Sequence, residues 1–454
     1  MAISNFPVSL QPAIQQGYLE AGFQQGLRSK LAFRQVADQE TVATGHGDTF
    51  TTTRIGLLPD ATTPINVSAV NPLSGTAAKL DSGLTPVIQS LEQYTLVMNE
   101  YGSTMDLNII TSKVGIANRF VQNAISQGEQ AARTMDRLAR NALYGGDTSN
   151  RGGYLSGNTY VRTASTGTQV AVDDIRGFQF LAVNGVQTAI GAGNPLPVLI
   201  NGNAYIVTAA VADVANASIS YGAMSGVLTL TAAVATGDAA VGMPVLSTIA
   251  PKIVRPNGRA STAALTATDQ VTMSVLLDAV ARLRSNAVPT VNGLYNFYSD
   301  PSTMRQLFAD PDFKQLFQGA AFEAAFSTGT VDQPFLGVRF MQTTESPVYA
   351  HPTIPGLYIH NPVIVGQGAL IEGNFPLQPL DIGVDQIGAT SYVDGVRYVV
   401  RPPLDRLGQI VTQSWQWDGG FCTPTDITVT PSVIPTATSA ALKRAVVVQH
   451  TAAI

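Results

Sequence analysis

The chain has 454 residues, of which 45% are hydrophobic and only 13% are charged, and its formal net charge is −5. This balance lacks the basic excess of proteins that wrap nucleic acid, and the single cysteine, Cys422, excludes an internal disulfide framework. Because typical soluble proteins are about 25% charged, the deficit fits two kinds of protein. One is a subunit covered by its neighbours, since interface cores are depleted in charge; the other is a large Thr-, Ala- and Gly-rich globular or fibrous protein.

Residues 1–30 form a polar, Gln-rich arm. It lacks the basic start and apolar core of a signal peptide, and nowhere in the chain does an uninterrupted apolar run reach the length of a membrane span. We expect Ala21, Phe23 and Leu27 to dock this arm on the rest of the protein.

Two strands follow, at 46–55 and 91–101, because both stretches are rich in β-branched and aromatic residues. The second strand should place Tyr94, Leu96 and Met98 on one face. Between the strands, the charged residues are Asp60, Lys79 and Asp81, and prolines at 59, 64, 72 and 86 prevent regular structure. Compact domains rarely carry loops this long unless they are functional. We therefore predict an extended two-stranded arm that becomes ordered by lying on another surface.

A long helix is predicted over 112–144, with Thr111 or Ser112 as its N-cap and Gly145 and Gly146 at its end. Apolar residues including Met135, Leu138, Ala139, Ala142 and Leu143 form one face. The opposite face carries Glu129, Arg133, Asp136, Arg137 and Arg140, and Glu129–Arg133 and Asp136–Arg140 are spaced as i,i+4 pairs. This charged face is either solvated or in contact with a neighbouring subunit.

Residues 151–262 predict a small all-β domain between helices. Short strands are expected at 168–172, 197–211, 217–222, 226–234 and 243–250. Asn201-Gly202 between two apolar runs is a strong hairpin signal.

From 266 onward the pattern is α/β. A helix is expected over 266–286, with Met273, Leu276, Val280 and Leu283 inside. Asp300-Pro301 and Asp310-Pro311 each read as an N-cap with proline at the first helical position. Strands are expected at 293–299, 335–343, 356–360, 362–371, 395–403 and 408–421, and the end is a Thr/Pro-punctuated β tail.

The residues predict no catalytic, cofactor or metal site. The four histidines, His46, His351, His360 and His450, have no metal-ligand spacing and no carboxylate or Cys pair nearby in the sequence. No nucleophile elbow, phosphate-binding loop or paired cysteine motif occurs. We interpret Cys422 as a small buried hydrophobic residue. Lys79 is interpreted as a solvated lysine, with an isopeptide bond to an Asn of a neighbour as the alternative.

The order of these elements resembles the major capsid proteins of tailed phages with the Hong Kong 97 fold, and more narrowly the family named for the phage N-four major capsid protein. The matching stretches are LTPVIQSLEQYTLVMNEYGSTMDL, GEQAARTMDRLARNALYGG, LLDAVARLRSNAVPTVNGLYNFYSDPSTMRQL, FLGVRFMQTTE and PLDRLGQIVTQSWQWDGGF. Their order and spacing carry the resemblance, because no single motif is diagnostic.

The resemblance implies an α+β, Hong Kong 97-like capsid fold with an inserted all-β domain. The implied division is an N-terminal arm (1–45), an E-loop (46–101), a P-domain with the spine helix (102–150), the inserted β domain (151–262), an A-domain (263–395), P-domain return strands (396–423) and a C-terminal β tail (424–454).

The implied function is a virion protein that self-assembles into the hexamers and pentamers of an icosahedral head around double-stranded DNA, in the bacterial host cytoplasm. Portal and scaffolding proteins are implied partners, a decoration protein is left open, and neither DNA sequence recognition nor a membrane is expected. The alternatives are an encapsulin-like compartment shell and a β-rich surface-layer or adhesin protein. The subunit-interface candidates are Arg54, Lys79, Asp81, Glu92, Glu129, Arg133, Asp136, Arg137 and Arg140.

Overall fold

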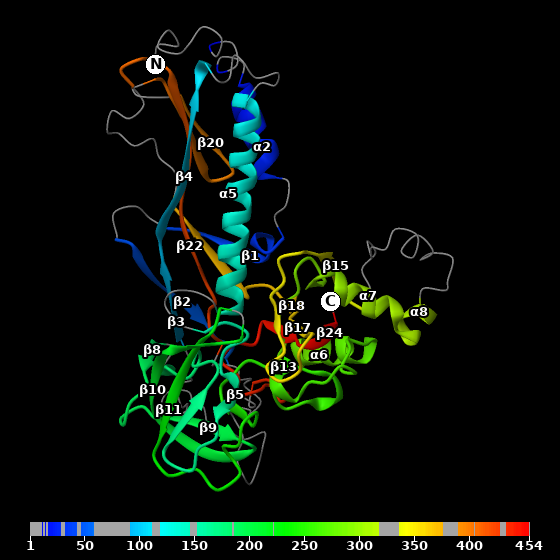
Figure 1. Ribbon diagram of the computed structural model, residues 1–454. Coiled ribbons are helices and arrows are strands. Elements are labelled where there is room, and N and C mark those ends of the chain that lie inside the picture. Colours follow the sequence, from blue (N-terminus) through cyan, green and yellow to red (C-terminus); the bar gives the residue numbers. More distant parts are fainter. Residues whose placement is uncertain are drawn as a thin grey trace, which may run out of the picture.

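A computed structural model gives the architecture of the chain (Figure 1). The described residues are 11, 14, 17–28, 32–42, 47–58, 91–110, 119–145, 152–183, 186–220, 222–316, 336–375, 389–403, 405–426 and 433–453. They form four parts: a body with a long helix on a sheet, a two-stranded arm, a closed barrel and an α/β unit.

The body is built on a six-stranded sheet of order β1-β19-β22-β21-β20, with β4 also paired to β22. Its strands are β1 (Ala37–Thr41), β4 (Asn99–Asn108), β19 (Leu370–Asn374), β20 (Ala389–Val393), β21 (Val396–Arg401) and β22 (Ile410–Cys422). Along β22, Val411, Trp415 and Trp417 are buried at alternate positions, as expected of a strand with one face on a core. The strands β19 and β20, which precede residue 395, also belong to this sheet.

Helix α5 (Arg119–Tyr144) packs its apolar stripe against this sheet. Its 26 residues span about 39 Å at 1.5 Å per residue. Met135, Ala139 and Leu143 are fully buried, which confirms the predicted inner face. Gly145, in the left-handed region at φ +100°, ends the helix as predicted. The predicted N-caps at 111 and 112 lie outside the described residues.

The N-terminal helix α2 (Tyr18–Leu27) lies along α5 (Figure 1). Phe23 and Leu27 are fully buried, as predicted, whereas the prediction for Ala21 is wrong, because it is exposed. The two helices touch at glycines: a Cβ atom at Gly26 would lie 2.2 Å from the carbonyl oxygen of Ile125, and one at Gly128 would lie 2.2 Å from that of Phe23. Only glycine permits so close a crossing.

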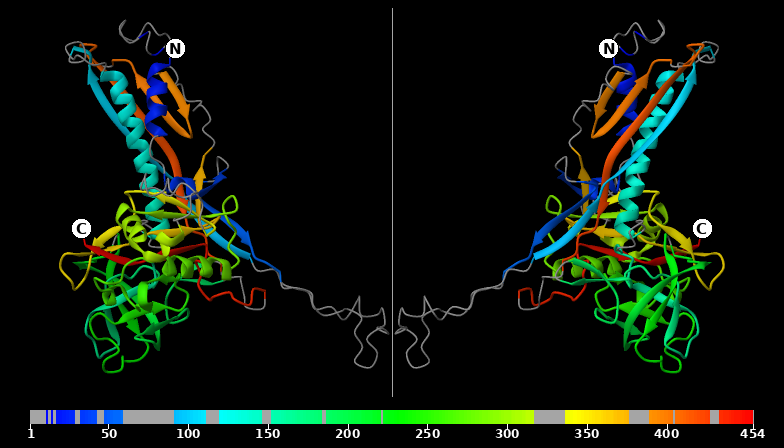
Figure 2. Two further views of the ribbon diagram at one scale, coloured as in Figure 1. Left: turned by 90° about the vertical axis from the view of Figure 1, so that its right-hand side faces the viewer. Right: turned by 90° about the vertical axis from the view of Figure 1, so that its left-hand side faces the viewer.

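The arm is the antiparallel pair β2 (Thr49–Ile55) and β3 (Leu91–Val97), with Thr49 opposite Val97 and Ile55 opposite Leu91. Both strands were predicted. Leu96 and Met98 are buried in a small cluster against which Cys422 packs, half-buried rather than fully buried as expected. Figure 2 shows this pair projecting away from the body.

The inserted segment folds as a closed six-stranded barrel of order β10-β11-β6-β5-β12-β9. Its strands are β5 (Asn158–Thr163), β6 (Gln169–Val172), β9 (Leu196–Ile200), β10 (Asn203–Ala217), β11 (Met224–Leu230) and β12 (Pro244–Ser247), and β7 (Phe180–Val183) pairs separately with β8 (Val186–Ala189). The predicted hairpin is confirmed, since Asn201 (φ 51°) and Gly202 (φ 85°) connect β9 to β10. A strand at 217–222 is wrong: β10 ends at Ala217 and bends follow.

The α/β unit has a sheet of order β13-β23-β18-β14-β15 and a smaller one of order β16-β17-β24. Its strands are β13 (Ile253–Val254), β14 (Tyr295–Ser299), β15 (Val338–Gln342), β16 (Val348–Ala350), β17 (Leu357–His360), β18 (Val363–Val365), β23 (Ala445–Val448) and β24 (His450–Ala453); its helices are α6 (Met273–Ser285), α7 (Pro301–Ala309) and α8 (Pro311–Leu316). Short 3-10 turns lie at Pro256–Gly258 and Thr262–Ala264, and another lies at Arg34–Val36, just before β1.

Both aspartate caps in this unit are confirmed. The Asp300 carboxylate accepts the backbone N–H groups of Ser302 and Thr303 at the start of α7. Asp310 accepts the N–H of Asp312 and also that of Met273, so it holds the first turn of α6 as well. The predicted C-terminal β tail contains the strands β23 and β24, and β23 lies between β13 and β18 inside the sheet.

Candidate subunit interface

The predicted interface residues on α5 divide into exposed and buried members. Arg133 and Arg137 are exposed, and Glu129 is half-buried. Arg137 pairs with Glu345 at 3.0 Å, and the Arg133 Nε donates to the backbone oxygen of Glu129 rather than to its carboxylate. Exposed ion pairs of this kind contribute little to folding stability.

Asp136 does not lie on a solvated face, and that prediction is wrong. It is 2% exposed, and its Oδ1 accepts the backbone N–H groups of Ala32, Phe33 and Arg34 at 2.7–3.1 Å. Burial raises the pKa of Asp136 more than these three N–H donors lower it. The carboxylate thus anchors the chain where it leaves α2 for β1.

A second buried contact completes this elbow. Arg34, 8% exposed, donates three hydrogen bonds to the fully buried carboxylate of Glu372, at 2.6–3.0 Å. Arg34 lies just before β1, and Glu372 lies on the neighbouring strand β19. The ion pair therefore joins these two segments of the chain. Such a planar, forked contact is typical of arginine and carboxylate.

Arg140 was also expected on the open face, but it is nearly buried. Its Nη1 lies 2.8 Å from Glu345 Oε2. The hydrogen bond from Arg137 is the main cause that lowers the pKa of Glu345, and the charges of Arg137 and Arg140 lower it further. Each member of the predicted Asp136–Arg140 pair therefore has other partners.

Two candidates, Arg54 and Glu92, lie opposite each other near the outer end of the β2–β3 pair. Arg54 lies 3.3 Å from Asp426 and donates to the carbonyl oxygen of Gly368. Arg444 contacts the same Asp426 carboxylate at 2.5 Å. Glu92 was predicted to contact a neighbouring subunit. It is only 3% exposed, so its side chain is buried within this chain. Lys79 and Asp81 lie outside the described residues.

The arm becomes apolar and exposed as it leaves the body. Ile55 and Leu91, opposite each other at the end of the β2–β3 pair, are 62% and 52% exposed, and Leu57 and Leu58 follow at 58% and 52%. Four large aliphatic side chains at this end of the strand pair, all so open to solvent, are unusual unless another surface covers them.

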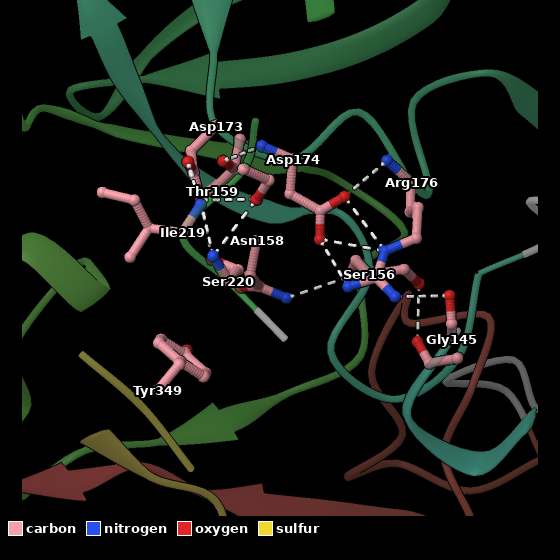
Figure 3. Close-up of polar contacts among 12 residues, drawn as sticks. Gly145, Ser156, Asn158, Thr159, Asp173, Asp174, Arg176, Ile219, Ser220 and Tyr349 are labelled. Atoms are coloured by element: carbon pink, nitrogen blue, oxygen red, sulfur yellow. Dashed lines mark hydrogen bonds and ion pairs between the residues drawn. The ribbon is translucent and has the colours of Figure 1, made fainter. Parts of the chain in front are cut away.

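The joint between the barrel and α5 was not predicted from the sequence (Figure 3). Arg176, 2% exposed, forms a buried ion pair with Asp174 at 2.8 Å, and its Nη1 donates to the carbonyl oxygen of Gly145 at 2.5 Å. That carbonyl belongs to the residue that ends α5. A guanidinium group from the barrel therefore caps the long helix.

Beside this pair, Asp173 organises the chain after β10. Its carboxylate accepts the N–H groups of Ile219 and Ser220 and the hydroxyl groups of Ser218 and Ser220, at 2.7–3.3 Å. A signal was present in the sequence: Asp173, Asp174 and Arg176 are the charged residues between 163 and 212. Charges isolated in so apolar a stretch are candidates for buried pairs.

A second missed cluster lies in the α/β unit. His360 Nδ1 lies 2.9 Å from Asp300 Oδ2, and His450 Nε2 lies 2.7 Å from the Thr303 hydroxyl. The two imidazole rings are stacked at 5.3 Å. Burial lowers the pKa of His450 to about 4; although burial alone would raise the pKa of Asp300, His360 and Thr303 hold it at about 2. The sequence placed no carboxylate near these histidines, because Asp300 is 60 residues from His360.

Within the part of the chain that the structure describes, no group of three His, Cys, Asp or Glu side chains is placed to hold a metal ion. Of the helices described, none combines the length and the apolar character required to cross a membrane.

The comparisons with known proteins place this arrangement among phage capsids. No family model and no curated protein matches the sequence. Among solved structures, the chain is similar to one titled the capsid of Ralstonia phage GP4, at 10% identity over 94% of this chain and 92% of that chain, with a TM-score of 0.51. It is also similar to the capsid structure of the Cyanophage P-SCSP1u, at 12% identity over 93% and 88%, with a TM-score of 0.44. The likeness to the GP4 capsid runs almost end to end, and from it we conclude that this chain has a phage capsid fold.

Proposed function

We propose that this chain is the major capsid protein of a tailed phage, which self-assembles into hexamers and pentamers of an icosahedral head around double-stranded DNA. The observation that carries the proposal is the whole-chain likeness to the capsid of phage GP4. The exposed apolar end of the arm supports it, because aliphatic side chains at 52–62% exposure need a covering surface.

In this proposal the arm is the E-loop, α5 is the spine helix of the P-domain, and the α/β unit around α6 and α7 is the A-domain. The barrel is an insertion fixed to the end of the spine helix by Arg176 and Gly145. Many modest contacts per subunit suffice for a stable shell, because each added copy engages several neighbours at once. The shell would be located in the virion, with portal and scaffolding proteins as further partners.

Purification of the full chain followed by negative-stain microscopy tests the proposal. We expect closed particles for the natural sequence, and a deletion of residues 57–88 should leave soluble subunits without shells. Leu91→Asp should also block assembly, because it places a charge where the arm must be covered. Leu407→Asp is the matched control, since Leu407 is 78% exposed in a turn remote from the arm in the sequence.

Normal shells from the deletion variant would contradict the role of the arm. Particles isolated from infected cells that contain a protein cargo and no DNA would favour the encapsulin-like compartment instead. A protein that stays monomeric under all assembly conditions would contradict both shell functions.

A further inference from the structure

A polar groove in the α/β unit lies between α6 and the segment that follows β13. Its volume is about 740 Å³. One wall is the exposed side of α6, with Ser274, Asp278 and Arg282, and the other is formed by residues 253–259. No motif in the sequence pointed to it, and the proposed shell function does not use it.

The loop in this wall is held in one conformation. Asp269, fully buried, accepts hydrogen bonds from Asn257 Nδ2 at 2.7 Å, Arg259 Nε at 2.9 Å and the backbone N–H of Thr266 at 2.7 Å. Asn257 and Gly258 both have left-handed backbones, at φ 53° and 64°, which costs energy at the asparagine and needs such support. Burial alone would raise the pKa of Asp269, but these hydrogen bonds hold it below its usual value.

Arg255 brings a positive charge to the groove without a carboxylate to balance it. Its Nε donates to Gln449 Oε1 at 2.8 Å and its Nη1 to the carbonyl oxygen of Ala260 at 3.0 Å. Gln449 is itself oriented by Tyr349 and Asn361, which receive its amide N–H groups. Among the described residues, no acidic side chain lies within ion-pair distance of Arg255, and burial lowers its pKa to about 10.

The charges around the groove do not cancel. Arg259 is neutralised by Asp269. Arg282 on α6 is exposed and, like Arg255, has no ion pair with any side chain that the structure describes. Asp278 is the one carboxylate among the lining residues. Two arginines without an ion pair to any described residue thus line the groove together with one carboxylate, in a chain whose overall charge is negative.

We propose that this groove is an oxyanion-binding site, and that a carboxylate side chain of a second copy of this chain fills it in the assembled protein. The choice of a second copy rests on the proposed shell function. The chain itself supplies suitable carboxylates, because Asp38, Glu100 and Asp312 are exposed acidic residues without an ion pair to any described residue. A planar guanidinium fork matches a carboxylate in geometry as well as in charge.

Inorganic phosphate is the probe for the site on unassembled, full-length subunits. We expect phosphate to raise the melting temperature at constant ionic strength. Arg282→Gln should raise the half-maximal phosphate concentration about 10-fold, as expected for loss of one charge-assisted hydrogen bond. Arg255→Gln should act in the same direction, and Asp278→Asn in the opposite one. Arg305→Gln, an exposed arginine on α7 outside the groove, is the matched control and should change nothing.

Assembled particles identify the occupant. If a neighbour's carboxylate fills the groove, particles should show no phosphate-dependent stabilisation, and Arg282→Gln should assemble less well than Arg305→Gln. A phosphate response that persists in particles, with normal assembly of Arg282→Gln, overturns the second copy as the occupant. Absence of any phosphate response in subunits overturns the oxyanion site. If the natural sequence forms no particles, the shell function fails, whereas the titration of subunits still decides whether the groove binds oxyanions.

Discussion

The body and the barrel use charge in different ways. In the body, Asp136 and the Arg34–Glu372 pair are buried deep between α5 and the sheet, where they hold the N-terminal elbow. In the barrel, the interior is apolar, and Asp174 and Arg176 are buried at the joint with α5. In both regions the buried charges lie where distant segments of the chain meet. A buried carboxylate is costly unless its acceptors are filled, so it fixes a junction more strictly than an apolar contact does.

The largest effect is expected for Met135→Asp in the core of the body. The new carboxylate would replace a fully buried apolar side chain with no donors arranged around it. The cost should be about 5 kcal/mol or more, comparable with the whole stability of a domain. Circular dichroism should show no cooperative unfolding transition, whereas Arg133→Asp, on an exposed position of the same helix, should leave the transition intact.

Asp136→Ala tests the elbow. It removes the acceptor of three backbone N–H groups, and we expect the free energy of unfolding to fall by about 4 kcal/mol. Asp136→Asn keeps one oxygen acceptor and should lose less. Urea denaturation measures both variants. Equal losses for the two would mean that the negative charge, and not the accepted hydrogen bonds, stabilises the elbow.

Arg176→Met tests the joint of the barrel. It leaves Asp174 buried without its guanidinium partner, which should cost about 3 kcal/mol. Hydrogen exchange should accelerate at residues 152–157 and at the end of α5, while the barrel strands stay protected. The double variant Asp174→Leu/Arg176→Met should recover part of the loss, because it removes both charges together. A double variant less stable than the single one would contradict this account.

The histidine cluster predicts a dependence of stability on pH. Because the pKa of His450 is about 4 in the folded chain and about 6.5 in the unfolded chain, the unfolded chain binds more protons between these values. Stability should therefore fall as the pH decreases, by about 2 kcal/mol from about pH 7 to about pH 5. His450→Gln should flatten this part of the curve. Burial also lowers the pKa of His351, which adds to the pH dependence. The test is therefore the difference in pH dependence between the natural sequence and His450→Gln.

The smallest change in stability is expected for Arg137→Glu, below about 1 kcal/mol, since its pair with Glu345 is exposed. Assembly should nevertheless decrease if this face of α5 contacts a neighbour. Glu345→Gln removes the charge partner of Arg137 within the chain and leaves Arg137 in place. An equal loss of assembly in Glu345→Gln would show that the intrachain pair, and not a contact of Arg137 with a neighbour, matters.

The sequence determined much of the local structure. The apolar stripe of α5, the two strands of the arm, the Asn201-Gly202 hairpin and the caps at Asp300 and Asp310 all follow from spacing and local backbone chemistry. These features depend on residues near one another in the chain, and local hydrogen bonds and periodic burial fix them.

The tertiary structure decided where the charges are used. Periodicity placed Asp136 on the polar side of α5, and it could not reveal three N–H donors that lie 102–104 residues earlier. The same holds for Asp300 with His360 and for the last two strands, β23 and β24, which join two different sheets of the α/β unit. The physical reason is that burial of a polar group is allowed only where folding supplies its partners, and those partners come from segments that no local pattern connects.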